Sequence, residues 1–159
     1  AFGLGADFIK NFQKIKYQGL VGYFLAFVKT LFTIKEKYFI IDVDGQRIIT
    51  KPLILIISNT KQQGYNFTVT PKARTDDGFL DMFIIENISN FKNIKNIFKI
   101  IFGLKFCPSE CIYKKIMNVN LTPQKPIENI QIDGEKLYSM DRCFKIKISK
   151  NKLQLIAPV

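Results

Sequence analysis

The sequence predicts a mainly β protein with peripheral helices (α+β), built as an antiparallel β-sandwich. Two features favour this class: about eight or nine short apolar runs of strand character, and hairpin-type links between most of them. Hairpins join neighbouring strands in opposite directions, whereas parallel sheets need long crossover connections. Hydrophobic residues make up 47% of the 159 residues, enough to bury one core, so we expect residues 1–159 to form a single domain.

The first third of the chain begins with helical spacing and then changes to strands. Residues 6–17 carry apolar side chains every three to four positions, which predicts a helix, and residues 19–34 are apolar on nearly all sides, which predicts a second, largely buried helix. Residues 38–43 and 46–49 have strand character. Asp44-Gly45 between them is typical of a type I′ hairpin, because both central residues of that turn need positive φ.

Short apolar runs in the rest of the chain predict further strands. They lie at 53–57, 67–69, 80–85 and 113–121. Two hairpins are expected at the end of the chain: 128–132 with 135–138 around Asp133-Gly134, and 144–148 with 153–156 around Lys150-Asn151.

Residues 88–106 predict the clearest helix, with Ser89 as its N-cap. One stripe of this helix is apolar, and three lysines lie off it. The stripe contains Phe91, Ile94, Ile97, Phe98 and Ile101, and the lysines are Lys92, Lys95 and Lys99. The stripe either packs on a sheet while the lysines are solvated, or the helix lies on an anionic membrane.

The chain is strongly basic and contains no histidine. Its formal net charge of +11 favours polyanionic partners: nucleic acid, an anionic membrane or a nucleotide. We expect no nucleic-acid binding, because the sequence has no helix-turn-helix pattern and no aromatic and basic RNA-binding signature. Without histidine, acid–base chemistry falls to Asp, Glu, Lys, Tyr or Cys.

The cysteines and the ends of the chain bear on its location. Cys107, Cys111 and Cys143 form no zinc-type set, so we interpret them as reduced thiols of a cytoplasmic protein. The longest apolar run, 19–32, contains Lys29 and is too short for a transmembrane helix. No signal peptide is visible, and the abrupt start at Ala1 suggests a domain taken from a longer protein.

The first acidic turn, Asp76-Asp77-Gly78, is a candidate Mg²⁺ site. Mg²⁺ prefers oxygen ligands, and a curled turn can supply the carboxylate of Asp77 with the main-chain carbonyls of Arg74 and Phe79. The alternative is a plain tight turn before a strand, which Asp-Asp-Gly also favours.

The second acidic turn, Asp133-Gly134-Glu135, is a candidate catalytic site. Glu135 can act as a general base that accepts the proton of an attacking hydroxyl, with Asp133 orienting it. The alternative is an ordinary type I′ hairpin, and the chain has such a candidate at Asp44-Gly45-Gln46.

In their order along the chain, these motifs resemble the C-terminal domain of the diacylglycerol kinase and sphingosine kinase superfamily of lipid kinases, in particular its bacterial diacylglycerol kinase branch. The matching residues are Gly3-Leu4-Gly5-Ala6-Asp7, Asn59, Pro71-x-Ala73-x-x-Asp76-Asp77-Gly78-x-Leu80-Asp81 and Ile132-Asp133-Gly134-Glu135. The segment 61–66 departs from the family, because it has one glycine where the family commonly has a glycine-rich run.

The resemblance implies a two-domain enzyme of which this chain is the C-terminal β-sandwich. The N-terminal domain of such kinases binds ATP with a Gly-Gly-Asp-Gly motif, which does not occur in this sequence. By similarity, Glu135 is the base for a lipid hydroxyl such as that of diacylglycerol, and Asp77, with carbonyls of Arg74 and Phe79, forms a structural Mg²⁺ site. ATP is the co-substrate, and the isolated fragment is expected to be inactive.

The resemblance also sets expectations for partners. They are a lipid substrate, the protein's own N-terminal domain and peripheral association with the inner face of an anionic membrane. Two alternatives remain: a non-catalytic β-sandwich module that binds lipid or a membrane surface, and a structural sandwich that forms a homodimer.

Overall fold

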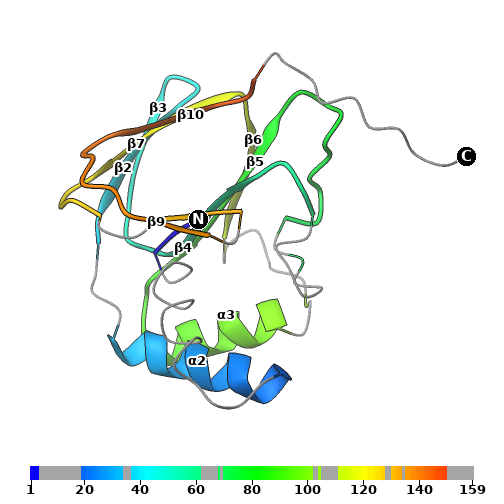
Figure 1. The fold of residues 1–159 in the computed structure, drawn as a ribbon, viewed down its shortest axis with the longest axis vertical. Helices are drawn as coiled ribbons and strands as arrows, with labels where there is room; N and C mark the ends of the chain where they lie inside the picture. The colour runs from blue at the N-terminus through cyan, green and yellow to red at the C-terminus, as the bar shows by residue number, and fades with distance from the viewer. Residues whose placement is uncertain are drawn as a thin grey trace, which may run out of the picture.

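The structure, a computed structural model, is an antiparallel β-sandwich and confirms the predicted fold class (Figure 1). It consists of two four-stranded sheets, a separate two-stranded hairpin and helices outside the sheets. The residues that the structure describes are 1–3, 19–33, 37–61, 68, 70–101, 104, 111–127, 130–133 and 135–149. The predicted helix 6–17 and strand 153–156 lie outside these residues.

The first sheet has the strand order β1-β4-β5-β6, with every neighbouring pair antiparallel. Its strands are β1 (Phe2–Gly3), β4 (Pro52–Ser58), β5 (Leu80–Glu86) and β6 (Ile112–Ile116). β4 and β5 are buried along almost their whole length, because both faces of this sheet are covered. Ile54, Ile56, Phe83 and Ile85 fill the face turned away from the second sheet.

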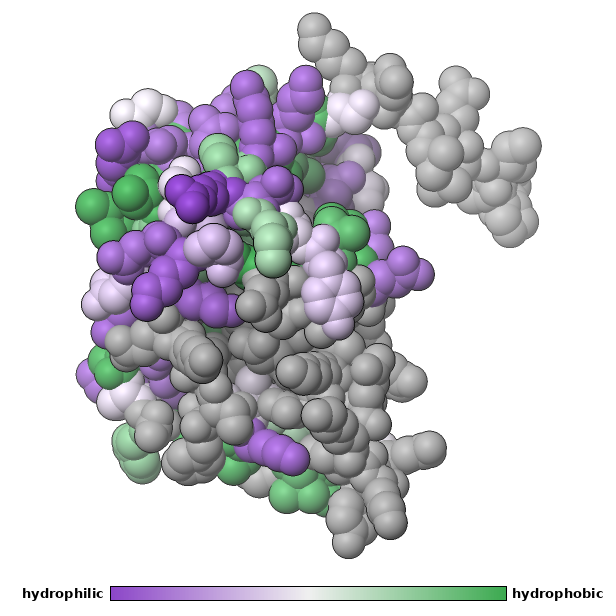
Figure 2. All heavy atoms as spheres, turned by 60° about the vertical axis from the view of Figure 1, so that its left-hand side comes forward, coloured by the Kyte–Doolittle hydropathy of each residue, from purple (hydrophilic) through white to green (hydrophobic). Residues whose placement is uncertain are grey.

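The second sheet has the order β10-β7-β2-β3. Its strands are β2 (Phe39–Val43), β3 (Gln46–Thr50), β7 (Asn118–Pro123) and β10 (Phe144–Lys147). The turn between β2 and β3 has φ of 49° at Asp44 and 72° at Gly45, as the type I′ prediction requires. Hydrophilic side chains gather over the part of the surface where this sheet lies (Figure 2).

The strand character predicted at 113–121 belongs to two strands, which lie in different sheets. β6 belongs to the first sheet and β7 to the second, and the chain passes from one to the other at Met117. The apolar pattern continues through this crossing because both strands face the same core, so the change of sheet leaves no break in the sequence.

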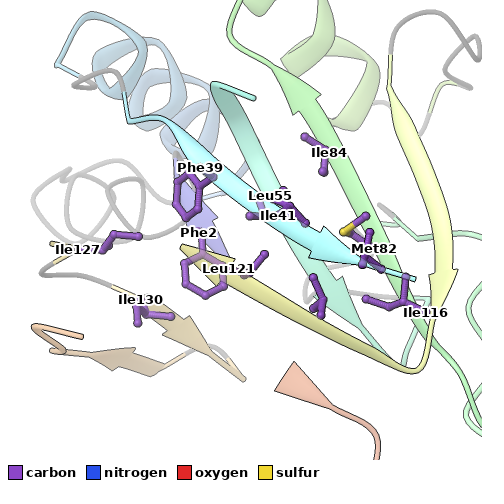
Figure 3. Close-up of a cluster of buried hydrophobic side chains, with 12 residues drawn as sticks. Phe2, Phe39, Ile41, Leu55, Met82, Ile84, Ile116, Leu121, Ile127 and Ile130 are labelled. Carbon is purple, nitrogen blue, oxygen red and sulfur yellow. The ribbon is translucent and has the colours of Figure 1, made fainter. Parts of the chain in front are cut away.

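The core lies between the two sheets (Figure 3). Each sheet contributes alternate side chains, as expected for a sandwich. The first sheet supplies Phe2, Leu55, Met82, Ile84 and Ile116, and the second supplies Phe39, Ile41, Val43, Val119 and Leu121. Phe2 joins the layers because its ring meets those of Phe39 and Phe144 at centroid distances of 5.9 and 5.3 Å.

Two helices, α2 (Gly19–Thr33) and α3 (Asn90–Ile101), contact each other and lie together at one end of the molecule (Figure 1). Ser89 caps α3 as predicted, because its hydroxyl accepts a hydrogen bond from the amide of Lys92 at 3.4 Å. Within the described part of the chain, no helix is both long and apolar enough to span a bilayer.

The burial of both helices differs from the prediction. α2 is buried along one side, at Ala26 and Thr30, but Val21 and Leu25 on its other side are 61% and 41% exposed. In α3, the predicted packing stripe is partly turned to solvent, because Phe91 is 81% exposed while Asn93 is buried. Apolar spacing therefore located both helices but did not predict which side of each helix faces the protein interior.

Candidate functional site

The first acidic turn leads directly into β5. Ala73 is buried and its amide donates to the Thr70 carbonyl at 3.0 Å, which ties the start of the turn to the preceding loop. Gly78 closes the turn at φ 76°, a left-handed conformation that favours glycine. The Asp77 carboxylate accepts the Phe79 amide at 3.0 Å, so this side chain shapes the turn.

Two cations neutralise this turn. Arg74 donates to both carboxylate oxygens of Asp76 at 3.1 and 3.0 Å, and these hydrogen bonds lower the pKa of Asp76. The Lys115 ammonium, on β6, contacts the other oxygen of Asp77 and lies 6.0 Å from the centre of the Phe79 ring. The contact with Lys115, followed by the hydrogen bond from Phe79, lowers the pKa of Asp77.

The predicted Mg²⁺ ligands fit a hard cation in kind. Asp77 offers a carboxylate whose lowered pKa keeps it ionised, and Arg74 and Phe79 offer main-chain carbonyls on the same turn. However, Lys115 already contacts this carboxylate, so a divalent cation would have to displace its ammonium group. No group of three or more acidic or cysteine side chains is arranged to hold a metal ion among the described residues, the first acidic turn included.

A buried carboxyl group lies beside the acidic turn. Asp81, on β5, is fully buried and accepts a hydrogen bond from the Tyr113 hydroxyl at 2.7 Å. Burial raises the pKa of Tyr113, and the hydrogen bond to Asp81 raises it further. The second oxygen of Asp81 and the side-chain oxygen of Asn59 are also buried, and neither has a hydrogen-bond partner among the described residues.

An open hollow lies on the other side of the same turn. Its volume is about 650 Å³, and its lining is mostly polar or charged. The lining residues that the structure describes are Thr60, Lys61, Thr68, Ala73, Arg74, Thr75 and Asp76. This hollow is the concave surface beside the first acidic turn, and neither Asp133 nor Glu135 is among these lining residues.

The second acidic turn is a hairpin, as predicted. β8 (Ile130–Ile132) pairs with β9 (Glu135–Leu137), and Asp133 has φ 48°, almost the value at Asp44 in the first hairpin. Glu135 is exposed.

β1 brings the two acidic turns to the same end of the first sheet. Ala1 and Gln131 exchange both main-chain hydrogen bonds, at 2.5 and 3.1 Å, which is the pattern of an antiparallel pair. At this contact β8 runs in the direction of β4, because Ala1 meets Gln131 in antiparallel fashion and β1 is antiparallel to β4. Continuing the register places Asp133 level with Ser58, which pairs with Asp81.

The spacing of strands gives a rough separation of Asp133 from Asp81. Three spacings, from Gln131 across the Ala1 contact to β4 and then β5, correspond to about 14 Å. Figure 1 shows β9 next to the chain start, in agreement with this arrangement.

Sequence analysis missed Tyr113 and Lys115 as parts of the site, and it gave Asp81 no role beyond its place in the motif. All three lie on one face of β5 and β6, where Asp81 is paired with Lys115 and Phe83 with Tyr113. The alternation in 112–116 shows that the two β6 residues share a face, but the pairing partner of a strand is not encoded in its own sequence.

Comparison with known proteins identifies the fold family. The family described as the YegS C-terminal NAD kinase beta sandwich-like domain matches residues 1–157. No curated protein sequence matches the chain.

Several solved structures from Bacillus anthracis str. Sterne have the same fold. One, described as a diacylglycerol kinase, is 19% identical with a TM-score of 0.55, and covers 76% of this chain and 42% of its own. Two others are described as candidate diacylglycerol kinases, and both have a TM-score of 0.58. The first is 20% identical, and the match covers 84% of this chain and 45% of that protein. The second is 23% identical, and the match covers 81% of this chain and 42% of that protein. The chain thus spans less than half the length of these proteins.

Proposed function

Because this chain belongs to the YegS C-terminal NAD kinase beta sandwich-like family, we propose that it is the acceptor side of an ATP-dependent lipid kinase. The observation that supports the proposal is the exchange of main-chain hydrogen bonds between Ala1 and Gln131, which sets the second acidic turn beside the sheet whose strand β5 follows the first acidic turn. The solved structures with this fold, described as diacylglycerol kinases or candidates for that activity, make the hydroxyl of a lipid such as diacylglycerol the first acceptor to test.

In the proposed reaction, Glu135 takes the proton of the lipid hydroxyl as the oxygen attacks the γ-phosphorus of ATP. The bond between that phosphorus and the β–γ bridging oxygen breaks, and ADP leaves with the electron pair. The products are a phosphorylated lipid, ADP and a protonated Glu135, which returns its proton to solvent. Asp133 orients Glu135 from the adjoining turn position.

Asp77 and the carbonyls of Arg74 and Phe79 would hold Mg²⁺ in a structural role. A bound ion there supplies positive charge that fixes the turn ahead of β5. Without the ion, Lys115 lowers the pKa of Asp77 and so keeps its carboxylate ionised. ATP itself would be bound mainly by the N-terminal domain of the longer protein, and this domain is the partner that completes the site.

Replacing Glu135 with glutamine tests the proposed base. The variant has the sequence Asp-Gly-Gln, which the chain already uses in the hairpin at 44–46. The aspartates of the two hairpins have nearly the same φ, 49° and 48°, so the fold should not change. In the full-length protein, with MgATP and diacylglycerol in mixed micelles, Glu135→Gln should lower kcat by about 10²- to 10⁴-fold. The matched control, Gln46→Glu in the first hairpin, should keep wild-type kcat.

The same assay separates this function from a non-catalytic module that binds lipid or a membrane surface. If Glu135→Gln keeps full kinase activity, Glu135 is not the base and the chain contributes binding alone. If diacylglycerol is not phosphorylated but another lipid alcohol is, the reaction class stands and the acceptor changes.

A further inference from the structure

Helix α3 presents a phenylalanine to solvent and buries asparagines. Phe91 is 81% exposed, whereas Asn93 and Asn96 are 1% and 5% exposed. An amphipathic helix that packs on a protein core normally has the reverse arrangement. The burial of Asn93 and the exposure of Phe91 therefore need a specific cause, and the Phe91 ring is left open to solvent.

Asn93 supplies that cause. Its amide nitrogen donates to the Asn87 side-chain oxygen at 2.7 Å, and its own side-chain oxygen accepts the Ile88 amide at 3.4 Å. These bonds hold the side of α3 that carries Asn93 against the segment leading in from β5. Residues follow one another by about 100° around a helix, so Phe91, two positions earlier, lies on the opposite side.

The exposed side of α3 combines apolar and positively charged groups. Ile88, just before the helix, is 57% exposed, and Lys92 and Lys95 are exposed beside Phe91. We call Ile88, Phe91, Lys92 and Lys95 the α3 face. Residues 90–101 contain no aspartate or glutamate, so the charge on this helix has one sign.

We infer that the α3 face docks on the surface of an anionic lipid bilayer. Aromatic and aliphatic side chains flanked by lysines are the composition of helices that lie in the membrane interface, where the apolar groups enter the acyl boundary and the lysines meet lipid phosphates. The uniform positive charge of α3 complements such a surface. The inference does not depend on Glu135 being a base, because it rests on the rotation and composition of α3.

Vesicle co-sedimentation of the full-length protein tests this docking without ATP or acceptor lipid. The probe is a vesicle of phosphatidylglycerol and phosphatidylcholine, compared with phosphatidylcholine alone. The variant Phe91→Ser, Lys92→Gln, Lys95→Gln should lower partitioning onto anionic vesicles about 100-fold, of which the two lysines account for about 30-fold. Salt should weaken wild-type binding, because it screens the lysines.

The matched control removes one exposed apolar side chain and two exposed lysines elsewhere: Met140→Ser, Lys145→Gln, Lys147→Gln. It should bind vesicles within about threefold of wild type. Equal losses in both variants would mean that net charge alone drives binding, and an unchanged triple variant would mean that α3 does not touch lipid; either result overturns the inference.

Two further outcomes identify a different occupant and also overturn the inference. A change in mass on light scattering, with vesicle binding intact, would assign the α3 face to a second copy of the chain. A fall of several degrees in the melting temperature would show that another part of the polypeptide covers Phe91. Because kinase activity toward micellar substrate is measured separately, failure of docking and failure of the proposed base are distinguishable.

Discussion

The hydrogen bond between Tyr113 and Asp81 gives the sharpest test of how the site is held together. Tyr113→Phe removes one hydroxyl, and the bond it makes is 2.7 Å long and reaches a fully buried carboxyl group. The other oxygen of Asp81 has no partner among the described residues, so the variant leaves the whole carboxyl group without a side-chain donor there. Stranding a buried polar group in this way costs about 1–3 kcal/mol.

A loss of about 2 kcal/mol corresponds to a fall in melting temperature of about 4–8 °C for a chain of this size. Differential scanning calorimetry or thermal circular dichroism measures it. The control Tyr38→Phe removes a hydroxyl from a tyrosine that is 43% exposed, and it should change the melting temperature by less than 2 °C, about half a kcal/mol. If Tyr113→Phe melts like the control, Asp81 is satisfied by another group, and the reasoning about this buried pair is wrong.

Two other variants test the turn and the core. In Lys115→Met, the pKa of Asp77 should rise toward its ordinary value, because Lys115 is the main cause of its lowering. In the wild type, the ion pair of Asp77 with Lys115 stabilises the fold above about pH 4, and this stabilisation is lost as the pH falls through the lowered pKa of Asp77. The free energies of unfolding of wild type and variant, measured in urea, should therefore differ at pH 7 and converge near pH 2. Mg²⁺ should also raise the melting temperature of the variant more than that of the wild type, which melts with Mg²⁺ and with chelator measure. Phe39→Ala removes a fully buried ring that contacts Phe2, and should cost about 3–5 kcal/mol in the free energy of unfolding, whereas Ile49→Ala on the exposed side of β3 should change it little.

Local features of the fold were predictable because their causes lie within a few residues. Asp44-Gly45 fixes a hairpin through backbone conformations that this pair adopts readily, and the structure shows both residues at positive φ. Ser89 marks the start of α3 because its hydroxyl accepts a hydrogen bond from the amide of Lys92, only three residues later. The resemblance to the lipid kinase domain likewise rests on short motifs, and the family match confirms it.

Features set by distant partners were not predictable. The burial of Asn93 in α3 goes with its hydrogen bond to Asn87, a contact that the apolar pattern of the helix does not reveal. The charge balance of the acidic turn depends on Lys115, which lies 38 residues from Asp77 and is brought there by the pairing of β5 with β6. Strand pairing and helix docking are decided by the whole core, so a single segment cannot reveal them.

The two Asp-Gly hairpins of this chain differ in how their charges are used. In the first, Asp42 is paired with Arg47 at 2.7 Å and Asp44 with Lys114 at 3.2 Å, so both carboxylates have partners within the fold. In the second, neither Asp133 nor Glu135 forms an ion pair with any lysine or arginine that the structure describes. The chain has 24 lysines and arginines against 13 acidic residues, so neutralising partners are plentiful. In the function proposed above, a carboxylate without such a partner would be available to accept the proton of a lipid hydroxyl, which is what a general base requires.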